Sequence, residues 1–142
     1  MSRCLALDVG DERIGLAISD EQGRLARPLE VVARKPGPSS FEHIRDVVQA
    51  QGVELIVVGW PLLADGTEGV QVRSTAAYLR GLAKFVSIPI VRWDERSSTT
   101  EADAIMAEDG TSRRRARRNR DAVAAAVILQ HYLDDKSEGV AW

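Results

Sequence analysis

The sequence predicts a single α/β domain, spanning residues 1–142, in which a mixed five-stranded sheet is flanked by helices. Three observations support this fold class. Three short apolar runs separated by polar turns fill the first 33 residues, which is typical of an antiparallel meander. After the KPGP segment at residues 35–38, helical periods alternate with apolar strand-like runs, which favours parallel strands joined by helices. A length of 142 residues also favours one domain over two.

Local signals define each element. Ser39 with Glu42 three residues later predicts a capping box at the start of a helix, and Gly52 ends that helix. The run at 55–59 is continuously apolar, which indicates a strand covered on both faces. Ser98 and Glu101 predict a second capping box. In the order βββαβαβαα, the strands are expected at 4–9, 14–19, 25–32, 55–59 and 88–93, and the helices at 39–51, 72–86, 98–110 and 118–133.

Composition excludes several classes of protein. Hydrophobic residues make up 44% and charged residues 28%, which argues against a disordered chain. One cysteine, Cys4, excludes an internal disulfide and a multi-cysteine zinc site, and two distant histidines argue against a histidine zinc site. The apolar run at 122–129 is far below the roughly 18 residues of a spanning helix, and the N-terminus lacks a signal-peptide pattern. We expect a soluble, cytoplasmic protein without a membrane partner.

The distribution of charge is more informative than the net charge of −2. Six arginines lie within residues 113–120, so the rest of the chain is distinctly acidic. We expect a basic loop at residues 111–120. Two interpretations remain open, because such a run is either a solvated charged segment or a clamp for the phosphates of a polyanion.

Acidic residues occur at positions that suggest a site. Asp8 and the neighbours Asp94 and Glu95 lie near the carboxyl ends of predicted strands, where open α/β sheets place their ligands. Asp121 begins the apolar stripe of the last predicted helix, so it needs a cation, a hydrogen-bond partner or a metal. Each acid also has a plain structural explanation. A turn or a helix cap explains the first three, and an arginine partner or a helix cap explains Asp121.

Together, the acids point to a metal. If the two strands are neighbours and the last helix crosses the same edge, the carboxylates converge and repel one another unless a divalent ion neutralises them. Oxygen ligands without histidine or cysteine favour Mg²⁺ or Mn²⁺. Two such ions catalyse phosphodiester hydrolysis, and the nearby arginines would hold the phosphate backbone. The residues therefore predict a metal-dependent nuclease with a two-metal-ion mechanism.

Four blocks of sequence, spread over nearly the whole chain in order, resemble the YqgF family. Its members are RuvC-related, RNase H-like proteins described as nucleases for pre-16S ribosomal RNA and formerly as Holliday junction resolvases. The blocks are LDVGDERIGLAISD at 7–20, VVGWPL with DGTEG at 57–69, WDER at 93–96 and DAVAAAVILQ at 121–130.

The resemblance implies an RNase H-like fold, maturation of the 5′ end of precursor 16S ribosomal RNA, and nucleic acid or ribosomal particles as partners. Strand alternation sends neighbours to opposite faces, so we expect only one of Asp94 and Glu95 to ligate, with Glu95 favoured. The implied catalytic residues are Asp8, Asp94, Glu95 and Asp121, with the metal held by Asp8, Glu95 and Asp121. The candidate nucleic-acid contacts are Arg13, Arg96, Arg113, Arg114, Arg115, Arg117 and Arg118.

Other functions remain open at this point. A DNase that resolves DNA junctions needs two sites in a dimer. The sequence contains no feature that marks a dimer interface, so we expect a monomer or a weak homodimer. A non-catalytic ribosome-assembly factor would use the same basic residues without the acids. Trp60 and Trp93 at strand ends either pack locally or stack on unpaired bases.

The basic run gives a first prediction. Replacing Arg114, Arg115, Arg117 and Arg118 should weaken nucleic-acid binding, and the slope of log affinity against log salt should become shallower by about 0.7 to 0.9 for each phosphate that is no longer neutralised. Binding titrations at several salt concentrations measure both quantities. An unchanged affinity with an unchanged slope would show that these arginines do not contact phosphate.

Overall fold

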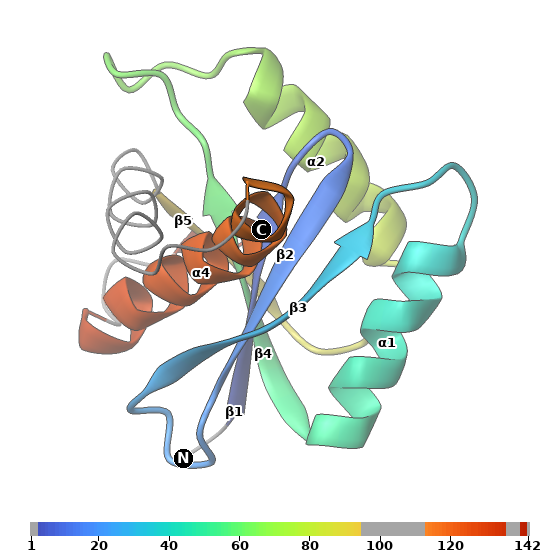
Figure 1. Ribbon diagram of the computed structural model, residues 1–142, viewed down its shortest axis with the longest axis vertical. Helices are drawn as coiled ribbons and strands as arrows, with labels where there is room; N and C mark the ends of the chain where they lie inside the picture. The colour runs from blue at the N-terminus through green and yellow to red at the C-terminus, as the bar shows by residue number, and fades with distance from the viewer. Residues whose placement is uncertain (1–2, 95–112, 136–139, 142) are drawn as a thin grey trace.

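A six-stranded mixed sheet with the order β3-β2-β1-β4-β5-β6 forms the centre of the molecule (Figure 1). The computed structural model describes residues 3–94, 113–135 and 140–141. Strands β1 (Arg3–Val9), β4 (Val53–Trp60) and β5 (Ile90–Asp94) run parallel to one another. Their carboxyl ends lie at one edge of the sheet, which we call the carboxyl edge.

Strands β2 (Arg13–Ser19) and β3 (Ala26–Ala33) pair antiparallel beside β1, so the predicted meander is confirmed. The ladder between β2 and β3 shifts register where Leu16 pairs with Glu30 and the next residue pairs with Pro28. Proline has no backbone N–H to donate, so it is tolerated on this edge strand.

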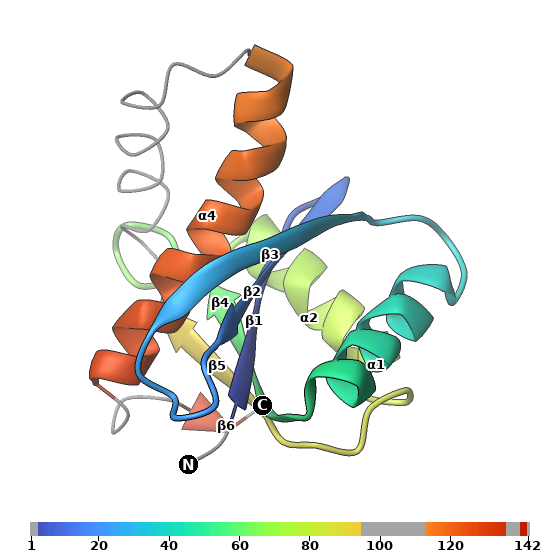
Figure 2. The same ribbon diagram turned by 60° about the horizontal axis from the view of Figure 1, so that its bottom comes forward.

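Helices α1 (Ser39–Gln51) and α2 (Val70–Leu82) cover one face of the sheet (Figure 2). Large aliphatic side chains fill the layer between these helices and the strands, and burying each one contributes roughly 1.5–3 kcal/mol. The fully buried members are Leu5, Leu7, Ile14, Leu16, Ile18, Ile44, Ile56, Val58, Leu79 and Leu82.

Helix α4 (Arg113–Asp134) covers the opposite face, where β1 and β2 present small side chains. Cys4, Ala6 and Ala17 line this face of β1 and β2, and Ala125 packs against them from the helix. Although α4 is 22 residues long, neither it nor any other described helix has the length and apolar character needed to cross a membrane.

The helix approaches β2 very closely at Gly15. A methyl group on Gly15 would overlap the main-chain carbonyl of Asp121 in α4. Glycine in a strand interior often marks such an approach of another backbone. The absence of a side chain at this one position therefore lets α4 rest directly on the strand.

Helix α1 begins without the capping box predicted for Ser39 and Glu42. The residue before the helix is Pro38, with φ −88° and ψ −3°, and no side chain caps the helix. Pro38 already has helical dihedral angles, so Ser39 lies inside the first turn rather than at the N-cap. The other end is as predicted, because Gly52 adopts φ 64° and its N–H donates to the Val48 carbonyl.

Helix α4 begins at Arg113, earlier than the predicted start at 118. The loop expected at residues 111–120 is therefore wrong over 113–120, where the backbone is helical. The prediction relied on an apolar period, which starts only after Asp121, whereas arginine favours helix regardless of burial. The helix predicted at 98–110 lies outside the described residues.

The sheet contains a strand that the sequence analysis missed. Strand β6 (Val140–Ala141) pairs antiparallel with β5 at the edge of the sheet. Two residues are too few for a periodic pattern, so the predicted five strands are present and this short sixth strand is added.

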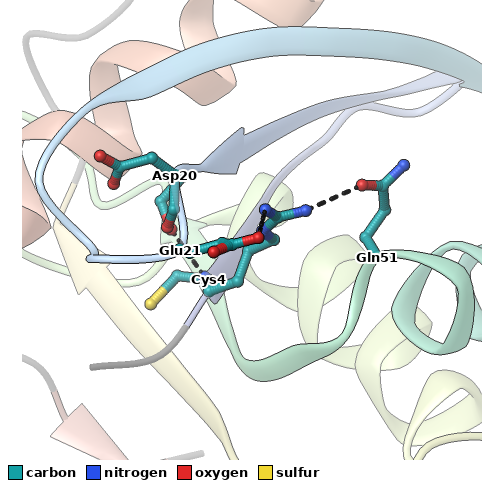
Figure 3. A network of polar contacts seen from close by, with 6 residues as sticks. Cys4, Asp20, Glu21 and Gln51 are labelled. Atoms are coloured by element: carbon teal, nitrogen blue, oxygen red, sulfur yellow. Dashed lines mark hydrogen bonds and ion pairs between the residues drawn. The ribbon is translucent and has the colours of Figure 1, made fainter.

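Arg3 anchors the amino end of β1, at the other end of this strand from Asp8, and its partners Glu21 and Gln51 are labelled in Figure 3. Its guanidinium donates to Gln51 Oε1 at 3.1 Å and lies 3.3 Å from Glu21 Oε1. An open pocket of about 520 Å³ lies here, lined in part by Arg3, Glu21 and Glu54. This pocket contains none of the acids predicted for the site.

The approach at Gly15 predicts a large effect of a small substitution. Gly15→Ala should lower the free energy of unfolding by about 1–3 kcal/mol, because α4 must move off the strand. Urea unfolding measures the loss, and Ala33→Val, at an exposed position on β3, should change stability by less than about 0.5 kcal/mol. Wild-type stability in Gly15→Ala would contradict the close packing of α4 on β2.

Candidate active site

Asp8 lies one residue before the end of β1 and faces α4. Leu7 and Val9 point into the core beneath α1 and α2, whereas Ala6 packs on the α4 side. Alternation along the strand places Asp8 on the same face as Ala6. Its side chain is half-buried, and in the sheet it pairs with Gly15 of β2.

Asp121 reaches the same place from α4. Its main chain lies against Gly15, which is the strand partner of Asp8. The two acids therefore meet at Gly15, one from the neighbouring strand and the other from the helix. The structure thus brings together two of the acids that the sequence predicts to converge.

Arg13 supplies a cation to Asp121. Its Nε donates to Asp121 Oδ2 at 2.6 Å, a short distance typical of a charge-assisted hydrogen bond. The side chains are 37% and 22% exposed, so water screens the pair and it contributes no more than about 1 kcal/mol. The arginine partner suggested for Asp121 is therefore present, and it is a residue predicted to contact nucleic acid.

Asp94 is placed on the other face of the sheet from Asp8. Val91 and Trp93 pack on the α4 side, whereas Ile90 belongs to the core beneath α1 and α2. Alternation along β5 therefore assigns Asp94 to the α1 and α2 side, and its side chain is exposed. Glu95 and Arg96 lie outside the described residues.

The described part of the chain contains no group of three His, Cys, Asp or Glu side chains able to hold a metal ion. Of the three predicted metal ligands, Asp8 and Asp121 lie together within it, and Glu95 lies outside it. The carboxylate oxygens that are present suit a hard divalent cation.

A family model described as "RuvX: Holliday junction resolvase" matches residues 2–135. The chain belongs to the RuvX family. A protein of Syntrophus aciditrophicus (strain SB) named "Putative pre-16S rRNA nuclease" is 42% identical over 136 residues, which cover 96% of this chain and 91% of that protein. A protein of the same name from Geobacillus thermodenitrificans (strain NG80-2) is 41% identical, covering 94% of this chain and 99% of its own length.

Solved structures agree on the fold. A structure described as T. thermophilus RuvC in complex with Holliday junction substrate matches with a TM-score of 0.62 and 15% identity, and the match covers 100% of both chains. A second structure of Thermus thermophilus RuvC has a TM-score of 0.56. The predicted RNase H-like fold of this RuvX-family chain is therefore confirmed.

The two tryptophans near the carboxyl edge of this RuvX-family chain make packing contacts. Trp60 is only 6% exposed, and the guanidinium of Arg92 lies 4.8 Å from its ring centroid. Trp93 meets Tyr132 of α4 edge to face, with 5.9 Å between ring centroids. Burial raises the pKa of the Tyr132 phenol above its ordinary value. The packing interpretation therefore holds for both tryptophans, and the burial of Trp60 argues against its stacking on bases.

The basic turns of α4, residues 113–120, project beyond the carboxyl edge (Figure 2). The helix runs from Asp121 toward the opposite edge, where Gln130 Oε1 accepts the N–H of Ala26 at 2.9 Å. The preceding eight residues therefore extend about 12 Å the other way. The unpaired N–H groups of a helix N-terminus add partial positive charge to this end. The arginines and one of the acids are thus carried by one continuous helix.

Two residues that organise the site were not singled out by the sequence analysis. Gly15 has a signal, because a glycine between branched apolar residues of a strand often marks a close backbone contact. Gln130 accepts from Ala26 and also donates from Nε2 to the Arg24 carbonyl at 2.9 Å, which fixes α4 to the turn before β3. These partners are more than 100 residues away in sequence, so no local pattern reveals them.

Proposed function

We propose that this RuvX-family chain is a metal-dependent nuclease that hydrolyses phosphodiester bonds of structured RNA and matures the 5′ end of precursor 16S ribosomal RNA. The observation that carries the proposal is the meeting of Asp8 and Asp121 at Gly15, beside the basic turns of α4. Acids repel the phosphates of a polyanion, so a protein that only binds nucleic acid has no use for them there. The names of the relatives support the choice of substrate.

Asp8, Asp121 and Glu95 are the residues that would hold Mg²⁺ or Mn²⁺. The donors are carboxylate oxygens, the ligand type these hard cations prefer. Bound divalent ions supply an activated water molecule and stabilise the leaving oxygen of the phosphodiester. The protein's own part is to fix the two acids at the carboxyl edge, which the contact of α4 with Gly15 supports.

We assign Glu95, rather than its neighbour Asp94, to the metal. Trp93 packs toward α4, so alternation gives Asp94 to the face opposite that of Asp8, which does not suit a shared metal. Asp94 would then not ligate the metal, and any role in catalysis would be indirect.

The basic turns of α4 are proposed to hold the phosphate backbone on either side of the scissile bond. Arg113, Arg114, Arg115, Arg117 and Arg118 belong to these turns. Arg13 is half-exposed beside Asp121, where a phosphate bound to metal would also lie within reach of its guanidinium. Arg96 is proposed as a further phosphate contact after β5.

Resolution of DNA junctions is a second candidate, favoured by the family description "Holliday junction resolvase". Symmetric cleavage of a junction needs two sites related by a two-fold axis. Sedimentation of the protein with and without a junction separates a monomer from a dimer that assembles on this substrate.

Cleavage assays with site variants test the proposal. A labelled precursor 16S RNA segment and a four-way DNA junction are incubated with Mn²⁺, Mg²⁺ or a chelator. Asp8→Asn and Asp121→Asn should lower metal-dependent cleavage at least about a hundredfold, because an amide oxygen is a poorer ligand than a carboxylate. Asp46→Asn, at an exposed position on α1, serves as the control and should cleave like wild type.

The two substrates and the chelator distinguish the outcomes. Preferred cutting of the RNA supports the proposed substrate, whereas preferred cutting of the junction favours the second candidate. Wild-type rates in Asp8→Asn would overturn the site. Binding that survives chelation, with no cleavage of either substrate, would make the protein an assembly factor instead.

A further inference from the structure

The turn that follows Asp8 is held by hydrogen bonds from outside itself. Gln71 Nε2 of α2 donates to the Val9 carbonyl at 3.1 Å. The guanidinium of Arg34 donates from Nη1 to the Gly10 carbonyl at 3.0 Å, and the backbone N–H of Arg34 donates to the Glu12 carbonyl at 2.8 Å. Three carbonyls within four residues of the chain are therefore fixed by two residues that lie far away in sequence.

Arg34 connects this turn to α2. Its Nη1 also donates to Ser74 Oγ at 2.9 Å, and Nη2 donates to the Ser74 carbonyl at 3.1 Å. Ser74 in turn donates from Oγ to Asp11 Oδ1 at 3.1 Å. The guanidinium lies 5.0 Å from the ring centroid of Tyr78, a cation–π arrangement. One side chain thus joins the end of β3, helix α2 and the turn.

The chemistry of these contacts suits arginine alone. Within the described residues Arg34 forms no ion pair, so its charge acts on carbonyl groups, a hydroxyl and a ring. The planar guanidinium donates in several fixed directions, whereas a lysine ammonium is a single point charge on a flexible stem. The Tyr78 ring is itself fixed, because its hydroxyl donates to buried Ser40 Oγ at 2.8 Å.

We propose that Arg34 is a positioning residue for the metal ligand Asp8. The last pairs of the β1–β2 ladder are Asp8 with Gly15 and Val9 with Ile14, and beyond them only the turn holds the hairpin closed. Arg34 fixes the turn and so keeps the Asp8 carboxylate in one orientation toward α4. Residues that orient metal ligands from behind typically change metal affinity or activity by 10- to 100-fold. The inference rests on the proposed function, which makes Asp8 a ligand.

Arg34→Lys tests the proposal because it keeps the charge and removes the fork of donors. In metal-free protein, hydrogen exchange of the Gly10 amide, which donates to the Arg13 carbonyl at 2.8 Å, should speed up at least about tenfold. Calorimetry with Mn²⁺ alone should give a 10- to 100-fold weaker affinity. In cleavage assays kcat should fall, KM for RNA should stay within about twofold, and excess Mn²⁺ should restore part of the rate.

Two further variants complete the design. Arg27→Lys, at an exposed position on β3, the strand that precedes Arg34, is the matched control. It should leave all three measurements unchanged. Ser74→Ala removes one acceptor of Arg34 and should shift exchange and Mn²⁺ affinity in the same direction by a smaller factor. It replaces Arg34→Lys if that variant does not fold.

The outcomes separate this proposal from the proposed function. Wild-type Mn²⁺ affinity in Arg34→Lys, beside a weakened affinity in Asp8→Asn, overturns the role of Arg34 and leaves the nuclease site intact. A raised KM with unchanged Mn²⁺ affinity makes Arg34 a substrate contact and overturns its positioning role. Unchanged Mn²⁺ affinity in Asp8→Asn overturns the metal site itself, and faster Gly10 exchange in Arg34→Lys would then reflect the turn alone.

Discussion

The close approach of α4 to β2 at Gly15 is the constraint on which the carboxyl edge depends. Large aliphatic side chains fill one face of the sheet, whereas β1 and β2 present small side chains on the other face, where the helix carrying Asp121 lies. At Gly15 no side chain separates the two backbones, so Asp121 arrives beside the strand partner of Asp8. Gln130 fixes the far half of the helix to the turn before β3. Packing of α4 on β2, rather than any attraction between the acids, sets the position of Asp121 relative to Asp8.

The balance of charge around the two acids links packing to chemistry. Arg13 neutralises part of the charge on Asp121 in the protein alone, and it does so from the same strand that supplies Gly15. The turns of α4 that precede Asp121 in the chain contain six arginines. Opposite charges thus lie in sequence along one helix, the basic part beyond the sheet and the acid upon it.

The strands could be predicted from sequence because their signals are local. Continuous apolar residues mark β4. The expectation that only one of Asp94 and Glu95 ligates a metal stays a prediction, because Glu95 lies outside the described residues. The start of α4 could not be found this way, since residues 113–120 carry no apolar period. Strand β6 owes its conformation to β5 rather than to its own two residues. The pair of Arg13 with Asp121 joins positions 108 residues apart, so only the folded chain reveals it.

The difference between the two faces of the sheet also determines which core positions tolerate substitution. Beneath α1 and α2, side chains such as Leu5 and Ile56 can exchange with other aliphatic residues of similar volume, because neighbours can repack around a changed shape. On the α4 face, Ala6 and Ala17 are fully buried beneath the helix, so added volume there would push α4 away from the sheet. Variation should therefore be more restricted on β1 and β2 beneath α4 than beneath α1 and α2. The geometry of the candidate site therefore depends on small buried residues that lie beneath α4 and not in the site itself.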